Sequence, residues 1–242
     1  MERKQPELYP VTVRSGALPL PTDSTQPQHH LSDAADVALS SRTVLKNTYW
    51  LLGSTLAFSA VIAYLSMSAP RPGLLVMLVG FYGLLFLTYK LQNSAWGLAA
   101  VFALTGFMGY TLGPIIGQFA GAGAMNIVAN ALTMTAIVFF GLSAYAITTK
   151  KDFSFLSGFL TAGFFVLLGA MVISFFVQSS TLQLAISAGF AVFSSAAILH
   201  QTGEIVRGGE RNYILATVTL FVSIYNLFLS LLSLLGAFGG DD

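Results

Sequence analysis

Runs of about 20 apolar residues recur along this chain, and outside the first 43 residues the charged side chains lie between or beyond these runs. A helix of about 20 apolar residues is long enough to cross the roughly 30 Å hydrocarbon layer of a membrane. A scan for apolar runs bounded by charged or turn residues predicts seven spans. They are Tyr49 to Ala69, Gly73 to Tyr89, Ala95 to Leu112, Ile127 to Thr148, Phe155 to Val177, Leu182 to Leu199 and Tyr213 to Leu235.

Composition supports the same class. Of 242 residues, 55% are hydrophobic and only 9% are charged, whereas soluble proteins are about 25% charged. The predicted fold class is therefore all-α, a polytopic membrane protein built as a seven-transmembrane-helix bundle in the lipid bilayer. The basic residues are scattered and the net charge is +1, which gives no patch for nucleic acid. The chain has no cysteine, which excludes disulfides and thiolate chemistry.

Three segments are predicted. Residues 1–43 are rich in Pro, Ser, Thr and Gln and lack apolar periodicity, which predicts a disordered N-terminal tail. The adjacent His29 and His30 are interpreted as solvated residues of this tail, because no further ligand lies near them in the sequence. Residues 44–238 form the predicted transmembrane domain, and residues 239–242 form a short C-terminal tail.

Lysine and arginine predict the orientation of the chain. If the N-terminus is cytoplasmic, the external loops contain only Arg71. The internal segments then contain Arg42, Lys46, Lys90, Lys150, Lys151, Arg207 and Arg211. We therefore expect a cytoplasmic N-terminus and, after seven spans, an external C-terminus.

The segment Gly113 to Met125 is the hardest to assign. Pro114 predicts a kink, and the glycines favour a broken helix end or a re-entrant piece. Gly109, Gly113, Gly117 and Gly121 are four residues apart, a spacing that permits close helix packing within one chain or between chains.

The last two spans are expected to form the centre of the bundle. The sixth is rich in Ala, Ser and Gly, and the seventh has a stripe of small polar residues on one face. Either this stripe supplies hydrogen bonds between helices, or it lines a hydrated path. The polar seam that we predict comprises His200, Gln201, Thr219, Ser223, Asn226, Ser230 and Ser233.

Residues Thr202 to Asn212 are predicted to form a cytoplasmic loop, with turns at Gly203, Gly208 and Gly209. Glu204 and Arg207 are spaced for an ordinary surface pair. Because His200 and Gln201 lie at the membrane end of the sixth span, we expect a polar group to face them. The candidate contacts for a protein partner are Glu204, Arg207, Glu210 and Arg211.

An enzyme is disfavoured, and we predict no catalytic residues, no metal ligands and no cofactor. The predicted spans contain no Asp and no HExxH motif, and His200 is the only histidine outside the tail.

Four segments resemble the Bax inhibitor-1 (transmembrane Bax inhibitor motif) family, most closely its bacterial YccA-like branch. The resemblance covers about Val44 to Gly236. It rests on VLKNTYWLLGSTLAFSA, GFMGYTLGPII, SAYAITTKKDFSFL and ILHQTGEIVRGGERNYILATVTLFVSIYNLFLSLLSLLG. It implies a seven-helix fold with a central C-terminal helix, located in the bacterial inner membrane with the C-terminus in the periplasm.

The resemblance implies two functions. The YccA-like branch is similar to proteins that associate with the membrane-bound ATP-dependent protease FtsH and restrain it, and the N-terminal tail is a possible initiation site for that protease. The alternative is a pH-sensitive calcium or cation leak that uses two facing aspartates. This alternative is weakened here because those positions align with Gln201 and Ser223, which do not titrate.

Overall fold

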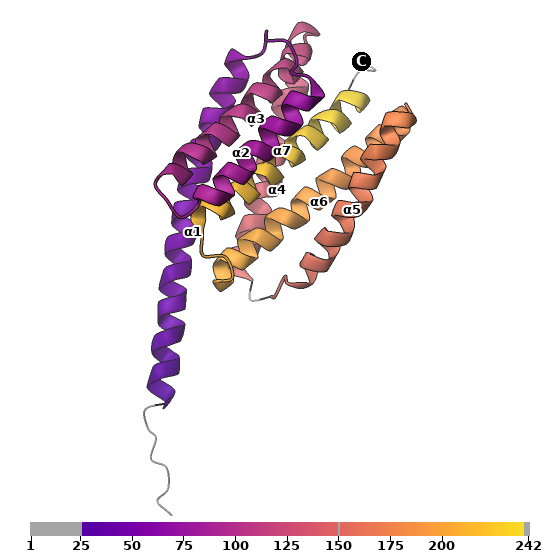
Figure 1. Cartoon of the computed structure of the whole chain (residues 1–242). Coiled ribbons are helices and arrows are strands. Elements are labelled where there is room, and N and C mark those ends of the chain that lie inside the picture. The colour runs from indigo at the N-terminus through magenta and orange to yellow at the C-terminus, as the bar shows by residue number, and fades with distance from the viewer. Residues whose placement is uncertain (1–25, 150, 240–242) are drawn as a thin grey trace, which may run out of the picture. The chain divides into compact units, whose positions relative to one another are not determined.

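The structure, a computed structural model, describes residues 26–149 and 151–239, with side chains from Leu39 onward. Seven helices lie within these residues (Figure 1): α1 (Gln26–Leu65), α2 (Leu74–Leu91), α3 (Trp96–Gly121), α4 (Met125–Thr148), α5 (Phe155–Phe176), α6 (Ser180–Arg207) and α7 (Tyr213–Phe238). Each is long and apolar enough to cross a membrane. The predicted all-α fold with seven spans is confirmed.

The first helix begins earlier than predicted. The chain divides into two compact units, residues 1–35 and 36–242. The described part of the first unit is the beginning of α1, so residues 26–43 of the predicted tail are helical. After Pro27, which is tolerated in a first helical turn, no Pro or Gly occurs before Gly53 to interrupt the helix. The rest of the predicted tail lies outside the described residues.

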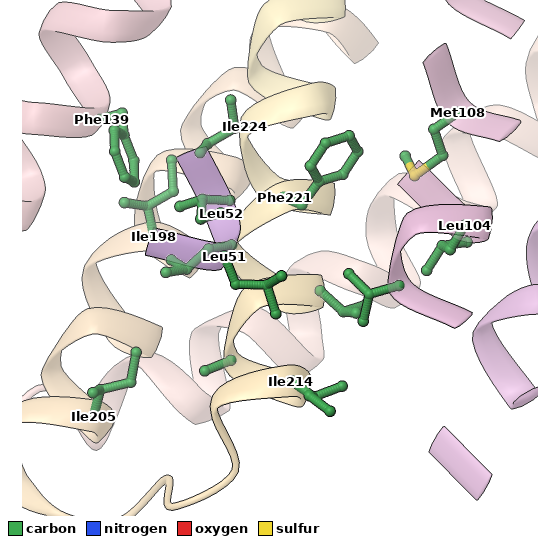
Figure 2. Close-up of a cluster of buried hydrophobic side chains, with 14 of the residues drawn as sticks. Leu51, Leu52, Leu104, Met108, Phe139, Ile198, Ile205, Ile214, Phe221 and Ile224 are labelled. Carbon is green, nitrogen blue, oxygen red and sulfur yellow. The ribbon is translucent and has the colours of Figure 1, made fainter. Parts of the chain in front are cut away.

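The C-terminal helix is central, as expected. In the 18-residue apolar stretch of each helix, 50% of the residues of α7 are buried inside the protein, against 56% for α3 and only 11% for α6. The main core cluster joins Leu52 of α1, Leu104 of α3, Phe139 of α4, Ile198 of α6 and Phe221 of α7, as Figure 2 shows. Helix α6 packs along α7 and contributes Ile198 and Ile205 to the same cluster, and α3 is buried to a similar extent as α7.

The segment from Gly113 is not a broken or re-entrant piece. Helix α3 continues through Pro114 to Gly121, and the chain turns into α4 at Gly123, whose φ is 72°. Proline has no N–H to donate, which leaves the carbonyl of Tyr110 without its helical partner. The Ser66 hydroxyl lies 3.3 Å from that carbonyl and shares its hydrogen with carbonyls of its own helix. A neighbouring helix thus compensates for the proline, as is usual within membranes.

The glycine ladder of α3 packs against α1 within the same chain. A Cβ atom on Gly113 would lie 2.6 Å from the carbonyl oxygen of Ala63, and one on Gly109 or Gly117 would also overlap a backbone carbonyl of the α1 side. A Cβ on Gly121, in contrast, would meet nothing within 4 Å. Three of the four ladder positions therefore let two backbones approach closely.

We expect Gly113→Ala to lower the free energy of unfolding by about 1–3 kcal/mol, because the added methyl group must push α1 away from α3. Thermal unfolding of the purified protein in detergent measures the change. Gly121→Ala is the matched control and should unfold like the wild type. Equal midpoints for the two variants would show that the α1–α3 contact is not tight.

Candidate functional site

The predicted polar seam lies mostly on α7, and its hydroxyls bond within their own helix. The buried Ser223 donates to the carbonyl of Thr219 at 2.8 Å, and the buried Ser230 donates to that of Asn226 at 2.7 Å. Serine hydroxyls in helices commonly bond to the carbonyl four residues earlier. These hydrogen bonds of Ser223 and Ser230 therefore do not link α7 to a neighbouring helix.

One hydrogen bond of the seam does join the two helices. Ser187 on α6 donates to Ser233 on α7 at 3.0 Å, near the end of the bundle where α7 finishes. Thr219 is exposed, and Asn226 is half-buried. Within the part of the chain that the structure describes, the seam is thus a set of separate polar groups rather than a continuous network.

Among the described residues, no hydrogen-bond partner faces Gln201, although a polar group was expected there. Its Nε2 atom is buried without a hydrogen bond, and no hydrogen bond among the described residues joins it to Ser223. Both residues lie in helices, because α6 continues to Arg207 and the predicted loop from Thr202 is wrong over its first half. His200, beside Gln201, is half-buried.

Further buried hydroxyls lack partners. They are Ser41 and Thr48 of α1, Ser143 of α4 and Ser194 of α6. Unpaired buried polar atoms are costly, and water can satisfy them where there is room. All of these groups are neutral. Among the described residues, no group of three or more His, Asp and Glu side chains is placed to hold a metal ion.

One cavity lies away from the predicted seam residues. It has a volume of about 800 Å³ and opens where the end of α3, the start of α4 and the end of α7 meet. Three carboxamides, from Gln118, Asn126 and Asn130, contribute to its walls. Neither Gln201 nor Ser223 lines it.

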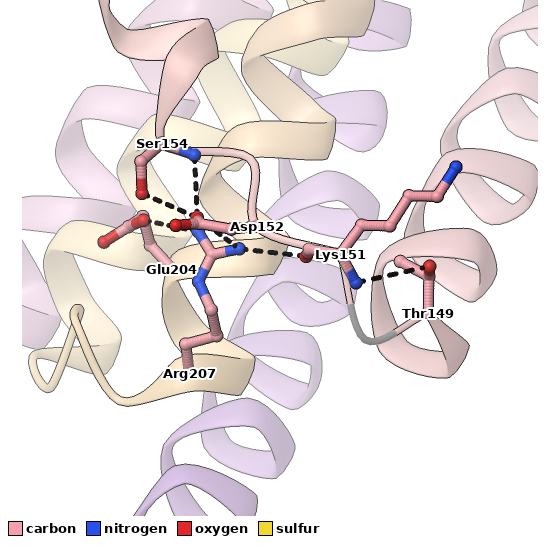
Figure 3. Close-up of polar contacts among 6 residues, drawn as sticks. All are labelled: Thr149, Lys151, Asp152, Ser154, Glu204 and Arg207. Atoms are coloured by element: carbon pink, nitrogen blue, oxygen red, sulfur yellow. Dashed lines mark hydrogen bonds and ion pairs between the residues drawn. The ribbon is translucent and has the colours of Figure 1, made fainter.

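Arg207, the last residue of α6, joins the α4–α5 loop to α6 at the opposite end of the bundle. Its guanidinium lies 3.0 Å from Asp152 in the α4–α5 loop and 2.7 Å from Glu204, and it donates to the Lys151 carbonyl at 3.2 Å (Figure 3). It also lies 5.8 Å from the ring centre of the buried Phe153, within range of a cation–π contact. Glu204 and Arg207 therefore hold the protein's own loops together. Asp152 was not among the predicted contact residues, because the composition of its loop does not indicate a pairing with Arg207.

Asp152 is held in its charged form. It accepts hydrogen bonds from the Ser154 hydroxyl at 2.6 Å and the Ser154 backbone N–H at 2.9 Å. These bonds, and to a smaller extent the charge of Arg207, lower the pKa of the Asp152 carboxyl below its usual range.

Capping interactions at both ends fix the α6–α7 loop. Helix α6 ends at Gly208, which has a φ of 79°, a conformation that glycine adopts readily. Asn212 caps α7 by accepting from the Ile214 N–H at 2.9 Å, and its side chain also donates to Asn93 at 3.0 Å. An asparagine directly before an apolar run is the sequence signal that would have identified this cap.

The two remaining predicted contact residues, Glu210 and Arg211, differ in how accessible they are to a protein partner. Glu210 accepts from the Asn212 backbone N–H at 2.7 Å, and it is half-buried. Arg211 is exposed and donates only to the Gly208 carbonyl, at 3.4 Å. Arg211 is therefore the predicted contact residue that most fully remains accessible to a partner.

Comparison with known proteins identifies relatives over most of the chain. A family model described as inhibitor of apoptosis-promoting Bax1 matches residues 41–240. A protein of Pseudomonas aeruginosa, of no stated function, is 61% identical over 218 residues, covering 89% of this chain and 98% of its own length. Modulator of FtsH protease YccA from Escherichia coli is 55% identical over 200 residues, covering 82% of this chain and 91% of its own length.

Arg207→Gln should lower the free energy of unfolding by about 1 kcal/mol, because partly exposed ion pairs contribute modestly. Since the pKa of Asp152 is lowered in the folded protein, its stabilisation is present above about pH 4 and is lost as the pH falls through the lowered value. Arg207→Gln should reduce this acid sensitivity in part, because the Ser154 hydrogen bonds remain.

Thermal unfolding in detergent between pH 7 and pH 3 measures both effects. Arg211→Gln is the control, because it removes the same charge from the same loop without breaking an ion pair. If the two variants lose equal stability, the Arg207 contacts contribute nothing specific.

Proposed function

The chain belongs to the Bax inhibitor-1 family, and on that premise we propose that this seven-span membrane protein binds a membrane-bound ATP-dependent protease of the FtsH type and restrains it. The observation that carries the proposal is the 55% identity, over 82% of the chain, to a protein named as a modulator of FtsH. We further propose the bacterial inner membrane as its location, because another relative at 55% identity is named an inner membrane protein.

We propose that the bundle acts as a poor substrate. A protease that pulls on this chain must separate α1 from α3, which meet backbone to backbone at Gly109, Gly113 and Gly117. It must also break the Arg207 contacts that join the α4–α5 loop to α6. Close packing and paired loop charges both oppose extraction. A protease that binds such a bundle would degrade it poorly, and while bound it would degrade fewer other substrates.

The proposed contacts with the protease lie at the end of the bundle that carries the α6–α7 loop. Arg211 is exposed there, and Lys151 extends away from the Arg207 cluster (Figure 3). Residues 2–25 precede α1, and we propose that they supply the segment that the protease first engages. Because α1 begins at Gln26, these residues can be removed without shortening any described helix.

In a reconstituted membrane system, the full chain should co-purify with FtsH and slow its degradation of a membrane substrate. Deletion of residues 2–25 should remove most of this inhibition. A variant with the same segment replaced by a Gly/Ser sequence of equal length separates loss of sequence from loss of length. An inhibition that survives the deletion unchanged would refute the role of the tail, and absence of any FtsH association would refute the proposed function.

A cation leak is the second candidate. The observation in its favour is the set of buried polar atoms without protein partners, Gln201 Nε2 among them, which water would satisfy. Against it, Gln201 and Ser223 supply neither a titrating group nor an anionic ligand for calcium. We therefore place it second.

Calcium flux into liposomes distinguishes the two functions. The wild type should show little flux and no pH dependence, whereas Gln201→Asp with Ser223→Asp should gain a flux that changes as the carboxylates titrate. Gln201→Asn with Ser223→Asn is the neutral control of equal size. A wild type that conducts as strongly and as pH-dependently as the double aspartate variant would favour the leak.

A further inference from the structure

A groove beside α1 combines two free cations with apolar walls. It has a volume of about 310 Å³ and is lined by Arg42, Leu45, Lys46 and Tyr49 of α1 and by Ile147 near the end of α4. The four α1 residues follow the spacing i, i+3, i+4, i+7, so they share one helix face. We propose that this groove binds one anionic phospholipid, with its phosphate at Arg42 and Lys46 and an acyl chain along Leu45, Tyr49 and Ile147.

No acidic side chain among the described residues compensates the charges of the groove. Arg42 and Lys46 are exposed, and neither forms an ion pair with any side chain that the structure describes. The acidic side chains of the described loops are used elsewhere, since Asp152 and Glu204 pair with Arg207 and Glu210 accepts from the Asn212 backbone. Two adjacent cations one helical turn apart suit a phosphate group, which offers several acceptor oxygens.

The walls of the groove are held in place by the core. The Tyr49 ring stacks on Phe139 of α4 with ring centres 5.8 Å apart, and its hydroxyl lies 3.4 Å from that of Thr202 on α6. Leu45 packs against the main core cluster. Ile147 remains 43% exposed and forms the opposite side. An acyl chain would therefore meet a preformed apolar surface rather than a mobile one.

The position of the groove along α1 fits the level of lipid headgroups. Trp50 is 80% exposed and follows Tyr49 directly, and Tyr145, two residues before Ile147, is 43% exposed. Exposed Trp and Tyr residues are typical of the membrane interface. Arg and Lys at that level extend their charged ends towards the headgroups while their stems cover apolar surface. The two cations thus lie at the level of the lipid phosphate, and the apolar residues of the groove lie beside them, where the acyl chain would run. This proposal does not depend on association with a protease.

Native mass spectrometry of the full, delipidated chain tests the site by titration with phosphatidylglycerol or phosphatidylcholine of the same acyl length. The wild type should bind one phosphatidylglycerol in clear preference to phosphatidylcholine. Arg42→Gln with Lys46→Gln should weaken phosphatidylglycerol binding on the order of thirtyfold, as expected for two basic residues near an anionic lipid. Ile147→Trp, which fills the groove and leaves both charges, should also weaken it.

Lys90→Gln with Lys151→Gln is the matched control, because it removes two other exposed cations and should leave the binding unchanged. Equal thermal unfolding midpoints confirm that each variant is folded, and any variant that fails this check is replaced by the single substitution Lys46→Gln. The proposal is overturned if the control loses as much binding as the groove variant, because charge alone would then explain it. It is also overturned if inorganic phosphate displaces the lipid at millimolar concentration, or if the groove variants bind as the wild type does.

Discussion

The structure depends on one constraint: a polar group within the hydrocarbon layer finds no water and must be satisfied by the protein. The hydroxyls of Ser223 and Ser230 meet this constraint by bonding to carbonyls of their own helix. They therefore add little to the contact between α6 and α7. Association of the helices relies instead on close contact of backbones and side chains, as where Gly113 meets the backbone around Ala63. The polar atoms that escape the constraint, such as Gln201 Nε2, are few and neutral.

Charge is confined to the ends of the spans, where it acts in two ways. Arg207 is engaged in contacts within the protein, because Asp152, Glu204 and the Phe153 ring all contact it. Arg42 and Lys46, in contrast, form no ion pair within the described residues and face outward beside an apolar groove. The first arrangement stabilises the loops, and the second offers a surface to the surroundings.

Sequence reasoning predicted the fold well and the site less well. The ends of α2, α4, α5 and α7 were placed closely, because apolar runs with charged borders carry strong information about membrane spans. The segment from Gly113 was expected to be a broken helix end or a re-entrant piece, because the hydroxyl beside the carbonyl that Pro114 leaves free belongs to Ser66, just beyond α1 and far away in the sequence. The start of α1 at Gln26 was not predicted, because the composition was averaged over all of residues 1–43. The polar residues of α7 recur at helical spacing, yet a pattern cannot show whether a serine bonds to its own helix or to a neighbour. Asp152 was missed because its partner Arg207 lies far away in the sequence, whereas Asn212 was missed although its position directly before an apolar run is a capping signal.

The hydroxyl of Ser66 beside the Tyr110 carbonyl has a consequence for biogenesis. The chain is synthesised from its N-terminus, so Ser66 leaves the ribosome before Pro114 does. When α3 enters the bilayer, the donor that shields its exposed carbonyl is therefore already present on the preceding segments. Helix α3 need not wait for any later part of the chain to cover the defect that its proline creates, which limits the time during which an unshielded backbone group faces lipid.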